Sequence, residues 1–132
     1  VNLGSCGALR PGLRGAFEPG VVLNHDMSAD AIRALGYDPR ERLTTGFGDP
    51  ELVLATGDLF VSDPAVRDVL AERASLVDME GYAVVMACQS FGVPVRVVKH
   101  VSDDADESAL DWATAVDTSA RDLAQWWTAN LA

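Results

Sequence analysis

The chain of 132 residues is poor in the residues that build metal centres and disulfide frameworks. It has only two cysteines, Cys6 and Cys88, and two histidines, His25 and His100, and their spacing is not that of a zinc site. The cysteines form no CxxC pair, so we expect free thiols in a reducing compartment, the cytoplasm. The sequence therefore gives no reason to expect a bound metal or a cofactor.

Positive charge and long apolar runs are also scarce. Ten Lys and Arg residues stand against 20 Asp and Glu residues, which gives a formal net charge of −10. Such a surface repels phosphates and anionic lipids, so neither nucleic acid nor a membrane is an expected partner. No run approaches the roughly 20 apolar residues of a membrane span, and no secretory signal pattern opens the chain. We expect small-molecule or protein partners.

Hydrophobic residues make up 48% of the chain, which is enough for one domain over residues 1–132. Apolar and β-branched runs predict strands at the start of the chain and at residues 20–24, 51–56, 75–77 and 93–101. Helical patterns cover residues 28–36, 63–74, 80–91 and 109–132. Strands that alternate with helices predict an α/β sheet with helices on both faces.

Apolar spacing also predicts which helix faces are buried. In the terminal helix, steps of three and four residues mark a stripe of Ala113, Val116, Ala120, Leu123, Trp127 and Leu131. The helix after Glu80 is apolar nearly all round, so we expect it to be buried together with that carboxylate, which would then need hydrogen-bond donors.

Unusual residues gather at four predicted strand ends: "GSCGA" (4–8), "TGDLF" (56–60), "DMEG" (78–81) and "SDDAD" (102–106). In open α/β sheets, ligands bind at the carboxyl ends of strands. Each motif alone also has a structural interpretation, as a glycine turn, a core aromatic or Met, a carboxylate at a helix start, or an aspartate-capped loop. A calcium loop fits poorly, because no glycine supplies its turn. The convergence of all four predicts a ligand site.

The motifs "GSCGAL", "ATGDLFVSD", "VDMEGYAVVMACQSFGVPVRVV" and "HVSDDAD" resemble, in order and spacing, the nucleoside phosphorylase/nucleosidase family. This family includes the methylthioadenosine/S-adenosylhomocysteine nucleosidases and the hexameric purine nucleoside phosphorylases. The resemblance implies a three-layer α/β fold with a central mixed β-sheet. It also implies an N-terminal truncation, because family members carry a strand and a helix ahead of the "GS" motif, with the glutamate that activates water in the nucleosidases.

The resemblance also implies roles for individual residues. Asp103 matches the acid that protonates, or hydrogen-bonds, the purine N7. Glu80 matches the carboxylate that holds the ribose hydroxyls, and Met79 packs on the sugar. Phe60 stacks on the base, and the backbone of Val61 reads the edge of the base.

Two serines complete the implied substrate-binding set. Ser5 lies in the loop that faces the ribose in nucleosidases and phosphate in phosphorylases, and Ser102 precedes the acid in the "SD" motif. The remaining aspartates, Asp104 and Asp106, are expected to shape or solvate the loop.

The implied function is a purine nucleosidase that hydrolyses the N-glycosidic bond of a 5′-modified adenine nucleoside, such as methylthioadenosine or S-adenosylhomocysteine. A phosphorylase and a non-catalytic nucleoside-binding remnant are the alternatives. Asn2 and Leu3 stand where the hexameric phosphorylases place a phosphate-binding arginine, and this favours water as the nucleophile. Arg10 and Arg14 follow the turn and are expected to be exposed.

The stretch "HDMSADAIRALGY" (25–37) resembles the family segment that reaches toward the site of a neighbouring subunit. Ile32 and Leu35 would then contact the 5′ group, and the protein would be a homodimer or a larger homo-oligomer. A surface helix with a core stripe is the alternative.

Overall fold

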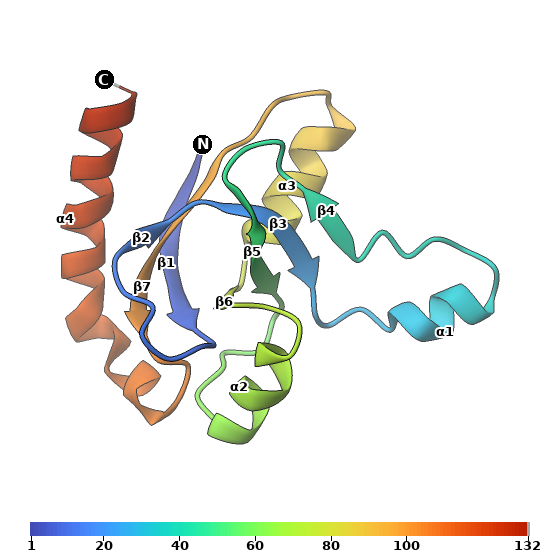
Figure 1. Cartoon of the computed structure of the whole chain (residues 1–132), viewed down its shortest axis with the longest axis horizontal. Coiled ribbons are helices and arrows are strands. Elements are labelled where there is room, and N and C mark those ends of the chain that lie inside the picture. Colours follow the sequence, from blue (N-terminus) through green and yellow to red (C-terminus); the bar gives the residue numbers. More distant parts are fainter. Residues whose placement is uncertain (132) are drawn as a thin grey trace.

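A seven-stranded mixed sheet is the centre of the computed structural model, which describes residues 1–131 (Figure 1). The strands lie in the order β2-β7-β1-β6-β5-β3-β4. Their bounds are β1 (Asn2–Ala8), β2 (Ala16–Phe17), β3 (Pro19–Asn24), β4 (Arg42–Thr44), β5 (Asp49–Thr56), β6 (Leu76–Asp78) and β7 (Val97–Asp103). Strands β1 and β7 are parallel, as are β3, β5 and β6, and the two groups meet antiparallel at β1 and β6.

Helices cover both faces of this sheet. The helices are α1 (Ala29–Ala34), α2 (Pro64–Ala71), α3 (Gly81–Ser90), α4 (Trp112–Asn130) and the 3₁₀-helix η1 (Glu107–Asp111). Helix α3 packs on β3, β4 and β5, whereas α4 packs on β7 and β1. Successive side chains of β7 alternate between faces: Val97 and Val101 join the core beside α3, and His100 bonds to α4. The three-layer α/β prediction with a central mixed sheet is therefore confirmed.

Two hydrophobic clusters form the core, one on each face. The cluster beside α3 includes Val22, Leu54, Leu76, Tyr82 and Val85. The opposite cluster lies under α2 and includes Leu9, Leu23, Ala55, Val77 and Ala105. None of the helices among residues 1–131 combines the length and the apolarity that crossing a membrane requires.

Most predicted elements are present, with shifted bounds. Asp63 caps α2 as expected, because its carboxylate accepts a hydrogen bond from the Ala65 N–H at 2.8 Å. The strand predicted at residues 93–101 instead runs from Val97 to Asp103, since Pro94 has no N–H for a sheet. The short strands β2 and β4 were not predicted.

The predicted buried stripe of α4 is partly wrong. The helix begins at Trp112, and its buried residues are Ser119 and Leu123, with Val116 half-buried. Four members of the predicted stripe are exposed: Ala113, Ala120, Trp127 and Leu131.

Polar contacts explain this rotation of the helix. Ser119 Oγ and Asp122 Oδ2 each lie 2.9 Å from a ring nitrogen of His100. Nearer the C-terminus, the guanidinium of Arg96 lies 4.9 Å from the ring centroid of Trp126, as a cation–π contact. A pattern of apolar residues alone does not report these contacts.

We expect Leu123→Ala to lower the free energy of unfolding by about 2–3 kcal/mol, because it removes a buried side chain that anchors α4. The matched change at the exposed end of the helix, Leu131→Ala, should cost less than about 1 kcal/mol. Urea denaturation of both variants measures the difference. Equal losses of stability in the two variants would show that α4 does not pack on the sheet through Leu123.

Candidate active site

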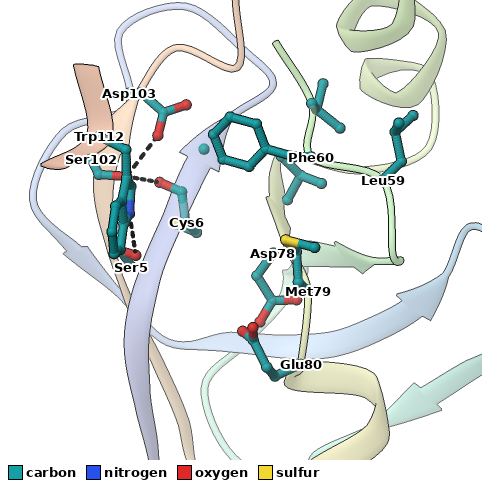
Figure 2. A pocket seen from close by; sticks show the side chains of 13 residues that line it. Ser5, Cys6, Leu59, Phe60, Asp78, Met79, Glu80, Ser102, Asp103 and Trp112 are labelled. Carbon is teal, nitrogen blue, oxygen red and sulfur yellow. Dashed lines mark hydrogen bonds between the residues drawn. The ribbon is translucent and has the colours of Figure 1, made fainter. Parts of the chain in front are cut away.

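A pocket opens where β1 and β6 stop pairing. Their antiparallel pairing covers only two residue pairs and ends at Gly7 and Val77. The cavity has a volume of about 290 Å³ (Figure 2). Its lining consists of Ser5, Cys6, Gly7, Leu59, Phe60, Val61, Val77, Asp78, Met79, Glu80, Ser102, Asp103 and Trp112.

All seven predicted site residues lie in this lining, although not always on the expected element. Ser5 was expected in a loop, yet it lies inside strand β1, and Asp103 is the last residue of β7 rather than part of the following loop. The reason is the divergence of β1 from β6, which exposes the middle of β1 as well as the strand ends. The structure thus brings the predicted residues together, while their roles stay predictions.

The carboxylate of Asp103 is held by two hydrogen bonds. Ser102 Oγ donates to Oδ2 at 2.7 Å, and the Ala105 N–H donates to Oδ1 at 2.9 Å. Ala105 is buried with φ +51°, a left-handed conformation that is uncommon for alanine. Backbone strain at this residue accompanies the orientation of the acid. The Oγ atom of Ser102 also lies 3.3 Å from the Cys6 carbonyl oxygen. In this structure Ser102 therefore links Asp103 to strand β1 and supports the orientation of the acid.

The other two aspartates of the motif anchor the loop away from the pocket. Asp104 forms two hydrogen bonds with Arg14, at 2.7 and 3.0 Å. Asp106 caps η1 by accepting the Ser108 N–H at 2.9 Å, and it lies 3.5 Å from Arg67. Hydrogen bonds from Ser108 hold the pKa of Asp106 below its usual value. The acidic run therefore divides into one pocket residue and two loop anchors.

Glu80 and Met79 form the side of the pocket at the start of α3. Both are exposed, and Glu80 makes no side-chain capping bond although it occupies the N-cap position. The expectation of a buried Glu80 on a fully buried helix is wrong: α3 buries only Gly81, Tyr82 and Val85. The carboxylate instead faces the cavity, where a ligand can supply donors (Figure 2).

Aromatic side chains line the pocket from two sides. Phe60 is 46% exposed and projects over the cavity from the segment after β5, while Val61 beside it is buried in the core. Trp112, at the first residue of α4, stands opposite, and its Nε1 donates to Ser5 Oγ at 3.1 Å (Figure 2). An aromatic slot of this kind suits a planar ligand. Trp112 was missed, because its helix was assigned by its apolar stripe alone.

A buried ion pair forms the floor beneath Glu80. Lys99 Nζ lies 2.8 Å from Asp78 Oδ2, and both side chains are 1% exposed. The same carboxylate accepts hydrogen bonds from Thr56 Oγ1 at 2.6 Å and from the Gly81 N–H at 2.9 Å. Asp78 thereby ties β5, β7 and the start of α3 together, and it fixes the backbone on both sides of Met79 and Glu80.

Close packing surrounds this ion pair. A Cβ atom at Gly4 would lie 2.8 Å from Lys99 Nζ, and one at Gly81 would lie 2.7 Å from a Leu54 methyl group. Burial raises the pKa of the neighbouring Cys6 thiol, so this pocket residue stays a neutral thiol. The sequence signal for this network is a single lysine within the run "VPVRVVKHV", and no local pattern indicates its role.

Within residues 1–131, no group of three or more His, Cys, Asp or Glu side chains is arranged to hold a metal ion. A cavity with a few convergent polar groups and aromatic walls has the character of a small-molecule site.

Comparison with known proteins gives the family. The model of the phosphorylase superfamily matches residues 51–130, which is more than half of the chain. The chain therefore belongs to the phosphorylase superfamily.

Two curated relatives are nucleosidases. Aminodeoxyfutalosine nucleosidase of Helicobacter pylori strain J99 is 46% identical over 61 residues, covering 45% of this chain and 26% of that protein. The 5′-methylthioadenosine/S-adenosylhomocysteine nucleosidase of Buchnera aphidicola is 26% identical over 137 residues, covering 84% of this chain and 53% of that protein. The chain thus spans about half, or less, of the length of these relatives.

Solved structures agree with this fold. The Helicobacter pylori 5′-methylthioadenosine/S-adenosylhomocysteine nucleosidase, in complex with a pyrrolidinol ligand, matches with a TM-score of 0.82 and 27% identity. The match covers 96% of this chain and 65% of that chain. The native futalosine hydrolase of Helicobacter pylori strain 26695 matches with a TM-score of 0.81 and 27% identity, covering 96% of this chain and 64% of that chain.

We expect Asp78→Asn to lower the free energy of unfolding by about 3–5 kcal/mol, because it leaves the buried Lys99 charge without compensation. Asp68→Asn makes the same chemical change in an exposed pair with Arg67 and should cost less than about 1 kcal/mol. Denaturant midpoints of the two variants provide the comparison. Similar small losses for both would mean that the buried pair is not needed for the fold.

Proposed function

We propose that the protein is a purine nucleosidase that hydrolyses the N-glycosidic bond of a 5′-modified adenine nucleoside. The observation that carries the proposal is one pocket with an oriented carboxylate at Asp103, an aromatic side chain at Phe60 and a second carboxylate at Glu80. These groups match three features of the substrate: Asp103 can protonate the leaving base, Phe60 can stack on the flat face of that base, and Glu80 can bind the sugar hydroxyls.

The base would lie against Phe60 with its N7 toward Asp103. As the bond between the sugar carbon and the base nitrogen breaks, its electron pair moves into the base, and a proton from Asp103 neutralises that charge. A positioned general acid contributes about 10²–10⁴-fold to such a reaction. The hydrogen bonds from Ser102 and Ala105 support this role, because they hold the carboxyl group in one orientation.

The sugar would lie between Met79, Glu80 and Ser5. An ionised carboxylate only accepts hydrogen bonds, so Glu80 suits the donor hydroxyls of a ribose. The sugar gains positive charge as the base departs, and this negative carboxylate stabilises that charge. Water then adds to the sugar carbon and gives its proton to the surrounding solvent, which leaves a free sugar.

Charge supports water over phosphate as the nucleophile. Among residues 1–131, the pocket lining contains three carboxylates, from Asp78, Glu80 and Asp103, and no Arg or Lys. The nearby Lys99 is buried and paired with Asp78. A phosphate dianion needs a fork of cationic donors and would be repelled here.

The names of the relatives narrow the substrate class. They are nucleosidases for 5′-methylthioadenosine, S-adenosylhomocysteine or aminodeoxyfutalosine. The name of the second relative gives a modified 5′ position, and this supports the same class here. Cys6 and Cys88 are both free, which supports the cytoplasm as the compartment.

In an assay of the purified protein, methylthioadenosine should yield adenine and free sugar at a rate that does not depend on added phosphate. Asp103→Asn should lower this rate by about 10²–10⁴-fold, because the general acid is lost. Asp104→Asn, in the loop pair with Arg14, is the matched control and should keep near-native turnover.

Chromatography of the base and the sugar product measures both results. A strict phosphate requirement with sugar 1-phosphate as product would reject hydrolysis. Near-native turnover by Asp103→Asn would reject the acid.

A homo-oligomer is part of the proposal. Helix α1 lies on an arm that projects away from the sheet (Figure 1). On this arm Leu35 is 74% exposed and Tyr37 is 71% exposed, while Ile32 is half-buried. Exposed large apolar side chains on a projecting segment are typical of a subunit contact. We propose that the arm packs against a second copy near its pocket.

Light scattering at micromolar concentration should give at least twice the monomer mass. Leu35→Asp should shift the protein toward monomer, because the change places a charge in the contact. Asp38→Asn on the same arm is the control and should leave the mass unchanged. A monomer in the unmodified protein would contradict the proposal.

A further inference from the structure

Two pocket residues are hydrogen-bonded to each other, and the direction of their bond constrains any ligand. The indole N–H of Trp112 donates to Ser5 Oγ at 3.1 Å. The two residues are 107 positions apart in the chain, one in β1 and the other at the start of α4. Figure 2 shows both side chains on the same side of the cavity.

This hydrogen bond can run in one direction only. An indole N–H is a donor without a lone pair to accept with, so the Ser5 oxygen must be the acceptor. A serine hydroxyl has one proton and two acceptor positions. Once Trp112 occupies one acceptor position, the Ser5 proton is available to another group. Within residues 1–131, the Ser5 side chain takes part in one hydrogen bond, which it accepts from Trp112.

The opposite wall has the complementary polarity. Glu80, when ionised, only accepts hydrogen bonds. Ser5 and Glu80 line the same cavity from the two segments that diverge beyond Gly7 and Val77. The sugar end of the pocket therefore presents a donor on the β1 side and an acceptor on the α3 side.

We infer that Trp112 is a positioning residue that orients the Ser5 hydroxyl by occupying one of its acceptor positions, so that its proton can be donated to a ligand. The pocket then suits a ligand with an acceptor oxygen toward Ser5 and a donor hydroxyl toward Glu80. That the ligand is a nucleoside rests on the proposed function. The alternative is that Trp112 serves only as an apolar wall. In that case Trp112→Phe changes the dissociation constant by the same factor whether or not Ser5 is present.

A double-mutant cycle separates these two roles. The four proteins are the wild type, Trp112→Phe, Ser5→Ala and the double variant, and the probe is a C-nucleoside analogue of adenosine, whose carbon–carbon bond to the base is not hydrolysed. Calorimetry measures the dissociation constant. Ser5→Ala should weaken binding about 2- to 12-fold, the range of one hydrogen bond.

The informative quantity is the coupling. Trp112→Phe should weaken binding at least twofold more when Ser5 is present than when it is replaced by Ala. Equal factors in both backgrounds would overturn the inference, because loss of the larger ring affects both alike. Trp127→Phe makes the same change at an exposed position of α4 and should leave binding unchanged.

A readout without ligand tests the bond itself. In a ¹H–¹⁵N spectrum, the indole signal of Trp112 is the one missing from Trp112→Phe. In Ser5→Ala this signal should shift and its proton should exchange faster with water, while the signals of Trp126 and Trp127 stay in place. An unchanged Trp112 signal would contradict the hydrogen bond.

Outcomes for this inference and for the nucleosidase proposal are distinct. A protein that shows the coupling but releases no base from methylthioadenosine retains the Trp112 role and rejects hydrolysis. A protein that hydrolyses the nucleoside without coupling rejects the Trp112 role alone. Failure of the wild type to bind the C-nucleoside rejects the inferred ligand contacts, and the methylthioadenosine assay decides hydrolysis separately.

Discussion

The short contact between β1 and β6 determines where the site can be. These two strands join two parallel groups that run in opposite directions, and they pair over only two positions. A longer pairing would bring Cys6 opposite Asp78 and close the sheet over the cavity. Because the pairing ends at Gly7 and Val77, the backbone beyond it is open on both strands.

This open sheet needs another link between its halves, and the Asp78–Lys99 pair supplies one. The pair joins the end of β6 to β7, two strands away across β1. Burying two charges is costly, and a buried pair is stable only when further hydrogen bonds satisfy it. Thr56 and Gly81 provide these bonds to Asp78. The same contacts that hold the halves together also hold Glu80 at the edge of the cavity.

Much of the fold could be predicted, because strands and most helices here carry local signals. The Asp63–Pro64 start of α2 is such a signal, and the structure shows the capping bond. The buried face of α4 could not be predicted from apolar spacing, since its central residue Ser119 is polar and is buried for its bond to His100. That partner lies in another element, and no local pattern reports it.

The residues of the candidate site also divide into those that local sequence motifs predict and those that depend on distant partners. Asp103, Glu80 and Phe60 were predicted because they lie in short motifs with a family resemblance, and the structure places them around one cavity. Lys99 and Trp112 were not, because each acts through a residue distant in sequence. The burial of Glu80 was predicted wrongly, since the composition of α3 shows how apolar a helix is and not how much of it the rest of the chain covers.

The three neighbouring aspartates show how a cluster of like charge is accommodated beside a pocket. Two of them, Asp104 and Asp106, lie beside Arg14 and Arg67, which partly compensate their charge. Asp103 has no arginine in the pocket lining and is held by neutral donors from Ser102 and Ala105. The arginines therefore fix the loop from outside, and the cavity keeps a carboxyl group that hydrogen bonds from Ser102 and Ala105 orient.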